Sequence, residues 1–158
     1  ARRAAVRCPG HDVKLPANLI TMKLITRDTD YALRAVCSIA SNGKRLSSVS
    51  SLSGELNIPR PFLRKLLQVL HSRGVLNSLK GRGGGFSLAK AAKEIFLWDI
   101  MQIFQGRFCL NECFLRRKVC PNINKCVLRK KIKRIENYVS RELKGINIDG
   151  LLSGQKEI

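Results

Sequence analysis

Residues Ile58 to Lys90 read IPRPFLRKLLQVLHSRGVLNSLKGRGGGFSLAK, a helical pattern followed by a glycine-rich hairpin pattern. Its first part opens on prolines suited to a first helical turn and continues with apolar residues at helical spacing. The predicted inward stripe is Phe62, Leu63, Leu66, Leu67 and Leu70. A glycine run, GRGGG, then separates two predicted strands, Val75 to Lys80 and Phe86 to Leu88. A helix followed by a glycine-tipped hairpin is typical of a winged helix.

Two further helices are predicted ahead of this stretch. Residues Asp28 to Ser41 have apolar residues at helical spacing. A second, shorter helix should end at a turn around Asn57, and Ser47 or Ser48 is suited to cap its start. Three helices followed by a hairpin form a winged helix-turn-helix, so we expect a mainly α fold with a small β-wing.

Three helices and one irregular segment are predicted after the wing. Residues Ile95 to Phe104 should form a largely buried helix, and a cysteine-rich irregular segment follows it. A long helix is predicted from Val127 to Leu143, with a short tail helix from Ile146 to Leu152. The long helix repeats apolar residues at intervals of four, three and four, which is typical of a coiled-coil seam. The residues of this predicted dimerisation seam are Leu128, Ile132, Ile135 and Val139.

The seam has two interpretations. The same spacing would arise if the long helix packed against the first helix within one chain. We favour a homodimer, because a helix-turn-helix module usually pairs to read two half-sites.

The chain therefore divides into four predicted parts. Residues 22–106 form a winged-helix domain, 107–126 a cysteine cluster loop, and 127–158 a dimerisation helix with its tail. Residues 1–21 are expected to be a leader that is disordered or foreign to the natural protein, because MKLITRDTDYALR from Met22 onward looks like a natural start. The leader lacks the apolar region of a secretion signal, so we expect a cytoplasmic protein.

The charge of the chain favours a polyanionic partner. The formal net charge at pH 7 is +19, and the sequence pI is about 10.4. The interval from Leu56 to Lys93 holds eight lysines or arginines and no acidic residue, so the charge is concentrated on the predicted winged helix. No apolar run is long enough to span a membrane. We therefore expect double-stranded DNA as the partner and no membrane contact.

Candidate DNA contacts lie on the third helix and on the wing. Arginine pairs bidentately with guanine edges, glutamine pairs with adenine, and lysine suits phosphates. Glycines in the wing allow positive φ and a close approach of the backbone to phosphate. A merely solvated helix face and a flexible hairpin tip are the plainer alternatives. The predicted contact residues are Arg60, Arg64, Lys65, Gln68, Lys80, Arg82 and Gly83.

Four cysteines are clustered within eighteen residues, at Cys109, Cys113, Cys120 and Cys126. Clustered thiols in a reducing cytosol more often bind metal than form disulfides. Structural zinc sites typically use cysteine pairs two to four residues apart, and only the first gap here is that short. Longer gaps suit an iron–sulfur cluster, with zinc and a thiol–disulfide switch as alternatives. No set of acid, base and nucleophile stands out, so we expect no enzyme.

Three stretches of the chain resemble a known family. They are MKLITRDTDYALRAV, the run from Ile58 to Lys90 with its GRGGGFSL wing, and ECFLRRKVCPNINKC. Together they resemble the bacterial iron–sulfur cluster regulators of the IscR type, whose relatives include the nitric-oxide sensor NsrR. The resemblance covers Met22 to about Leu152. It implies a homodimer that binds a palindromic or near-palindromic operator and responds to the state of its cluster.

The resemblance also implies a set of cluster ligands. The family's three cysteines correspond to Cys113, Cys120 and Cys126, which leaves Cys109 as a fourth ligand, a resolving thiol or a bystander. Many members place a histidine three residues after the last cysteine, where this chain has Arg129, which cannot ligate.

An aspartate is the second candidate for the fourth ligand. Some nitric-oxide sensors of the family use an N-terminal aspartate, and Asp30 matches its position. An aspartate from the partner subunit would couple the cluster to the geometry of the dimer; the alternative is that Asp30 only caps the first helix.

The sequence therefore predicts a DNA-binding transcriptional regulator. We expect a repressor that senses redox state, nitric oxide or iron–sulfur status through a 2Fe–2S or 4Fe–4S cluster. The alternative is a winged-helix DNA-binding protein with a structural zinc site or a thiol–disulfide switch.

Overall fold

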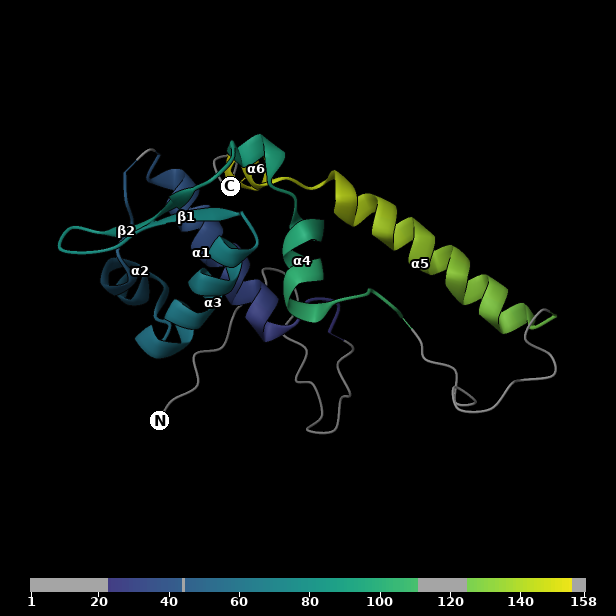
Figure 1. Ribbon diagram of the computed structural model, residues 1–158. Helices are drawn as coiled ribbons and strands as arrows, with labels where there is room; N and C mark the ends of the chain where they lie inside the picture. The colour runs from purple at the N-terminus through teal and green to yellow at the C-terminus, as the bar shows by residue number, and fades with distance from the viewer. Residues whose placement is uncertain (1–22, 44, 111–124, 155–158) are drawn as a thin grey trace, which may run out of the picture.

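The computed structural model describes residues 23–43, 45–110 and 125–154, and Figure 1 shows their arrangement. These residues form several helices and a two-stranded antiparallel sheet, which confirms the mainly α fold with a small wing. The elements are α1 (Arg27–Ser41), α2 (Val49–Leu56), α3 (Arg60–Ser72), β1 (Leu76–Leu79), β2 (Gly85–Leu88), η1 (Ala92–Glu94), α4 (Leu97–Gln105), α5 (Val127–Gly145) and α6 (Ile148–Gly154). The predicted leader, residues 1–21, lies outside the described residues.

The start of α2 distinguishes the two candidate serine caps. Ser48 is the cap, because its hydroxyl accepts a hydrogen bond from the Ser51 N–H at 3.1 Å. Ser47 instead forms an antiparallel bridge with Phe86, in which each N–H donates to the other residue's carbonyl at 2.9 Å. The predicted turn at Asn57 is confirmed, with a φ of 54° in the left-handed region that asparagine tolerates better than most residues.

Helix α5 begins at Val127 as the sequence predicts, whereas α4 and α6 each begin two residues later than predicted. Ile95 lies before α4, and its carbonyl accepts a hydrogen bond from the Ile148 N–H at 3.0 Å. Leu97 donates to the Ile146 carbonyl at 2.9 Å, so both helix starts are joined by extended backbone. Residues with apolar helical spacing are therefore extended where they pair with a distant part of the chain.

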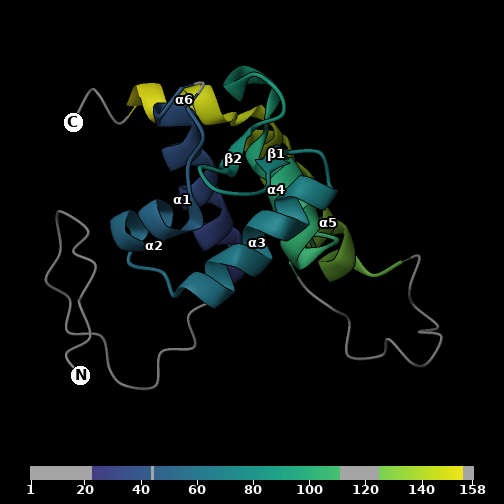
Figure 2. The same cartoon turned by 60° about the vertical axis from the view of Figure 1, so that its left-hand side comes forward.

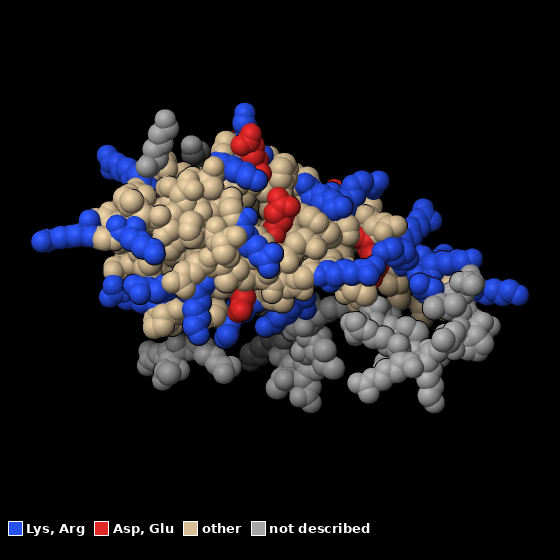
Figure 3. Space-filling model, viewed as in Figure 1, with Lys and Arg blue, Asp and Glu red and all other residues tan. Residues whose placement is uncertain are grey.

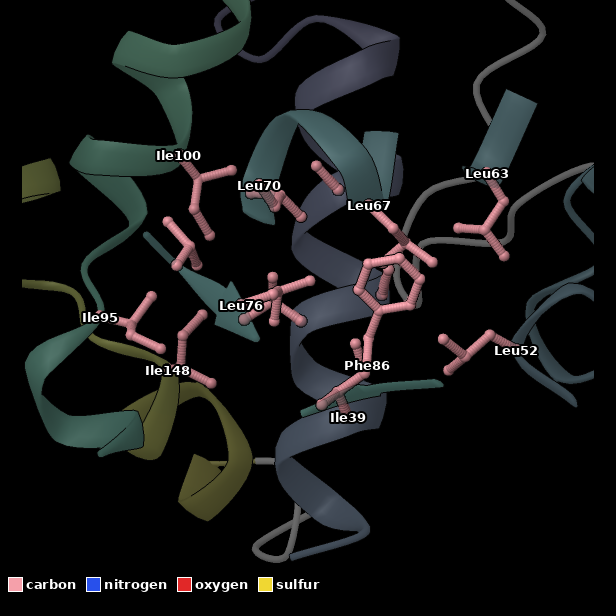
Figure 4. Close-up of a cluster of buried hydrophobic side chains, with 14 of the residues drawn as sticks. Ile39, Leu52, Leu63, Leu67, Leu70, Leu76, Phe86, Ile95, Ile100 and Ile148 are labelled. Atoms are coloured by element: carbon pink, nitrogen blue, oxygen red, sulfur yellow. The ribbon is translucent and has the colours of Figure 1, made fainter. Parts of the chain in front are cut away.

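The main core forms between α1 and the elements that surround it. Figure 4 shows how the buried apolar side chains of these elements converge. The inward stripe of α3 is buried as predicted, with Phe62 half-buried at its edge. The labelled core residues are Ile39, Leu52, Leu63, Leu67, Leu70, Leu76, Phe86, Ile95, Ile100 and Ile148. Because α3 and the wing share this core, the orientation of the two is fixed by packing.

Helix α5 extends away from the rest of the described chain (Figure 1). Among the described residues, the C-terminal half of α5 packs against apolar neighbours: Val139 and Leu143 contact a second apolar cluster that includes Leu97 of α4. Nearer its N-terminal end, Leu128 and Ile135 are 64% and 53% exposed. The predicted seam is therefore divided, because Val139 packs within the chain, against α4 and not mainly against the first helix. No helix in the described ranges is long and apolar enough to cross a bilayer.

Candidate DNA interface and cysteine segment

The predicted DNA contacts all lie on the surface of α3 and the wing. Arg64, Lys65 and Gln68 share one side of α3, because residues three and four apart lie on the same face of a helix. The buried leucines of α3 occupy the opposite side. All seven candidate DNA contacts are exposed to solvent: Arg60, Arg64, Lys65, Gln68, Lys80, Arg82 and Gly83.

Local hydrogen bonds hold α3 against α2, and Figure 2 shows the two helices next to each other. The Ser53 hydroxyl donates to the Ile58 carbonyl at 2.7 Å, and the Ile58 N–H donates to the Ser53 carbonyl at 3.2 Å. The Arg60 guanidinium also donates to the Ser50 hydroxyl of α2. The turn between the helices is therefore fixed, as a helix-turn-helix reader requires.

The wing presents two cations at a tight turn. Lys80 and Arg82 lie between β1 and β2, and Gly83 has a φ of 82°, which favours glycine. A Cβ on Gly85 would lie 2.6 Å from the Ser47 carbonyl oxygen, so a larger residue would clash with backbone. Packing against the chain's own backbone therefore accounts for part of the glycine run that the sequence suggested for phosphate approach.

The surface charge fits a nucleic-acid partner. Figure 3 shows lysine and arginine side chains projecting from the wing end of the molecule and along α5, with few acidic side chains on that face. The surface of α3 and the wing comes from residues 60–88, which contain no aspartate or glutamate. A phosphate backbone would meet attraction over this whole surface.

Removing one wing cation is expected to weaken binding to any duplex. Replacing Arg82 with alanine should lower the slope of log affinity against log salt concentration by about one unit, because one fewer phosphate contact releases about one fewer counterion. Titration of a labelled duplex at several salt concentrations measures this slope. Replacing Lys93, an exposed lysine of η1, is the control and should leave the slope unchanged. An unchanged slope in the Arg82 variant would place the wing outside the interface.

The described structure includes the two ends of the cysteine segment. Cys113 and Cys120 lie outside the described residues. Cys126 is the N-cap of α5, and its sulfur accepts a hydrogen bond from the Arg129 N–H at 3.4 Å. Hydrogen bonds to sulfur are among the factors that tune iron–sulfur centres, so this position suits a ligand. In the described part of the chain, no three side chains of cysteine, histidine, aspartate or glutamate gather as a metal site.

Asp30 lies in the first turn of α1 but is not its cap. The N-cap residue is Thr26, and the Asp30 carboxylate accepts a hydrogen bond from Arg34 Nε at 3.0 Å, so the capping interpretation is wrong. Figure 1 shows the start of α1 well separated from the start of α5. Asp30 and Cys126 of one chain therefore do not meet.

Gln105, the last residue of α4, is a connecting residue that the sequence patterns did not mark. Its Oε1 accepts hydrogen bonds from the Thr26 N–H at 3.1 Å and the Thr29 hydroxyl at 2.8 Å. Its Nε2 donates to the Leu24 carbonyl at 3.1 Å. An amide can accept and donate at once, so one side chain joins the start of α1 to the point where the cysteine segment begins.

Glu136 is a second residue that sequence reasoning missed. It is 7% exposed, and its carboxylate accepts hydrogen bonds from the Leu110 N–H at 2.9 Å and from Lys133 Nζ at 3.2 Å. Burial raises the pKa of this carboxyl, but hydrogen bonds from Leu110, Cys109 and Lys133, with the Lys133 charge, outweigh burial and lower the pKa overall. An available sequence signal was its position four residues after Ile132, which places an acid on the apolar side of α5.

Comparison with known proteins assigns the family. Residues 25–154 match the Rrf2 family, described as iron-dependent transcriptional regulators. Protein aau3 of Rhizobium meliloti is 31% identical over 135 residues, which are 85% of this chain and 88% of that protein. The HTH-type transcriptional regulator NsrR of Halalkalibacterium halodurans is 30% identical over 136 residues, which are 85% of this chain and 93% of the relative.

A solved structure supports the fold. CymR, the global cysteine regulator of B. subtilis, matches with a TM-score of 0.71 at 22% identity over 84% of this chain and 98% of that chain. Members of the matched family are transcriptional regulators and not enzymes. The chain belongs to the Rrf2 family of winged-helix, DNA-binding transcriptional regulators.

Proposed function

We propose that this regulator senses redox state, nitric oxide or iron–sulfur status through thiolates of its cysteine segment. The ligands in this proposal are Cys113, Cys120 and Cys126, with either Asp30 of a second copy or Cys109 as the fourth. The observation that carries it is the position of Cys126 as N-cap of α5, where a change at the sulfur acts directly on the start of that helix. The family's description as iron-dependent supports an iron centre over zinc.

The proposal includes a homodimer formed through α5. Leu128 and Ile135 are large exposed apolar residues on a helix that extends from the body, and Ile132 between them is half-buried. Burying such a face against a second copy would remove apolar surface from water. Because Asp30 does not meet Cys126 within one chain, a ligand from the partner subunit requires this pairing.

We further propose that the regulator acts in the cytoplasm as a repressor. A dimer must hold its two α3 helices about 34–36 Å apart, or a multiple of that distance, to meet successive major grooves. An iron–sulfur cluster, when bound, supplies a redox-active group that links the thiolates of the cysteine segment. The cluster can change the affinity for DNA only if it binds two conformations of the dimer with different affinities. A change in the cluster would act on the start of α5, and through α5 it would change the distance between the two α3 helices of the dimer.

Anaerobic purification tests the cofactor. The expected product is a brown protein with matched iron and sulfide per chain, measured together with zinc and the visible spectrum. A colourless protein with stoichiometric zinc would replace the cluster with a structural zinc site. A colourless protein that stays metal-free after anaerobic reconstitution would replace it with a thiol–disulfide switch.

Replacing Cys126 with alanine is expected to remove the iron and to change operator affinity by about 5-fold to 150-fold, the usual range of allosteric coupling. The matched control is Cys37→Ala, because Cys37 is also half-buried but lies on α1, in a groove away from the cysteine segment. The control should retain the iron content and operator affinity of the wild type. Iron content and operator titration are the measurements, and equal operator binding by the holo protein and the Cys126 variant would contradict the proposed switch.

A further inference from the structure

Both described ends of the cysteine segment are attached to the same helix. Cys126 caps the start of α5, while Cys109 and Leu110 are hydrogen-bonded to Glu136 in the middle of that helix. The ten residues from Cys126 to Glu136 correspond to about 15 Å along a helix. The described residues on either side of residues 111–124, Leu110 and Cys126, are therefore attached to two points of α5, the helix that carries the exposed apolar residues.

The attachment at Glu136 has the properties of a specific anchor. A buried carboxylate is costly unless donors satisfy it, and this one has a backbone N–H, a thiol and an ammonium group as partners. Glu142 on the same helix provides the contrast, because its side chain is 59% exposed and its ion-pair contact with Arg141 is at 3.7 Å. Glu136 therefore differs from a surface acid, because its carboxylate binds the start of the cysteine segment through Cys109 and Leu110.

A second contact fixes the residue that precedes the anchor. The Phe108 ring packs edge-on against Trp98 of α4, with centroids 6.0 Å apart, and the Lys144 ammonium lies 5.0 Å from the centroid of the same indole. Phe108, Cys109 and Leu110 are consecutive, so the chain is held first on α4 and then on α5. This arrangement fixes the direction in which the cysteine segment leaves the described structure.

We propose that Glu136 is a positioning residue that fastens the start of the cysteine segment to α5, and that Cys109 serves this anchor as a hydrogen-bond donor and is not a cluster ligand. A thiol that donates its hydrogen keeps its proton, whereas a cysteine that ligates iron is a thiolate. One sulfur cannot fill both roles at once. The role of Cys109 rests on the proposed function, whereas the anchor itself requires no metal.

The anchor can be tested in metal-free protein. Trp98 is the single tryptophan of the chain, so acrylamide quenching of its fluorescence reports the contact with Phe108. Glu136→Ala should raise the quenching constant, and the matched control Glu142→Ala should not. Circular dichroism checks that the alanine variant folds. If it does not, Glu136→Gln takes its place, because glutamine keeps the shape of the side chain but loses the charge, and it should raise the quenching constant above the wild-type value by a smaller amount. Wild-type quenching in the folded Glu136 variant would overturn the anchor.

The role of Cys109 is tested after anaerobic reconstitution with iron and sulfide. Cys109→Ser keeps a donor for Glu136, so it should retain the wild-type iron content and visible spectrum. Glu136→Ala should bind iron but lose it faster in air than the Glu142→Ala control. Loss of the spectrum in Cys109→Ser would make Cys109 a ligand and overturn its assignment. If the wild type itself takes up no iron, the proposed cluster fails, while Trp98 quenching still decides the anchor.

Discussion

Replacing Leu67 with alanine is expected to lower the free energy of unfolding by about 2–5 kcal/mol. Leu67 is fully buried, and Figure 4 shows it among the side chains that join α3 to the wing and to α1. The loss combines the transfer free energy of the deleted atoms with a cavity that rigid neighbours cannot fill. A domain of this size is stable by only about 5–15 kcal/mol, so the variant should lose a large share of its stability.

Urea unfolding followed by circular dichroism measures the effect. Val69→Ala is the matched control, because Val69 lies on the same helix but is 37% exposed. A partly exposed position should lose far less, on the order of 0.5 kcal/mol. Equal losses at the two positions would mean that α3 is not held by the core that its leucine stripe forms.

The sequence predicts α3 and its proposed DNA-facing side well, because the helical repeat of apolar residues locates both the buried and the exposed side of the helix. Leucines at intervals of three and four mark the buried stripe, and Arg64 and Gln68 fall on the opposite side. The boundaries of other elements are less predictable, because they depend on pairing between distant segments. Ser47 pairs with Phe86, and the Ile148 N–H donates to the Ile95 carbonyl, so backbone groups that local patterns assign to caps and helices bond elsewhere.

The connecting residues were missed for the same reason. Gln105 bonds to residues 76 to 81 positions earlier in the chain, and Glu136 bonds to Leu110, 26 positions earlier. Neither a helical period nor a motif encodes such partners. The spacing of apolar residues also predicts the apolar face of α5, but it does not predict which surface packs against that face. Val139 packs against α4 of the same chain, while Leu128 and Ile135 stay exposed.

Replacing Ile135 with lysine is expected to separate the dimer and to reduce operator affinity by about 100-fold or more, the scale lost when two linked binding events become independent. Ile135 is exposed in the described chain and becomes buried in the proposed pair, where an unpaired ammonium would be costly. The substitution adds a positive charge, which by itself favours binding to DNA. A loss of affinity must therefore come from the broken pairing and not from weaker electrostatic attraction.

Light scattering measures the oligomeric state and titration measures the operator affinity, and Asn137→Lys is the control variant. Asn137 is exposed and lies two residues further along α5, about 200° around the helix, so it adds the same charge on another face. Affinity for a duplex with one half-site should be equal in both variants, because Arg64, Gln68 and the rest of α3 are untouched. Only the two-site operator should distinguish them. A dimeric Ile135→Lys protein with full operator affinity would mean that copies pair through a surface other than this apolar face of α5.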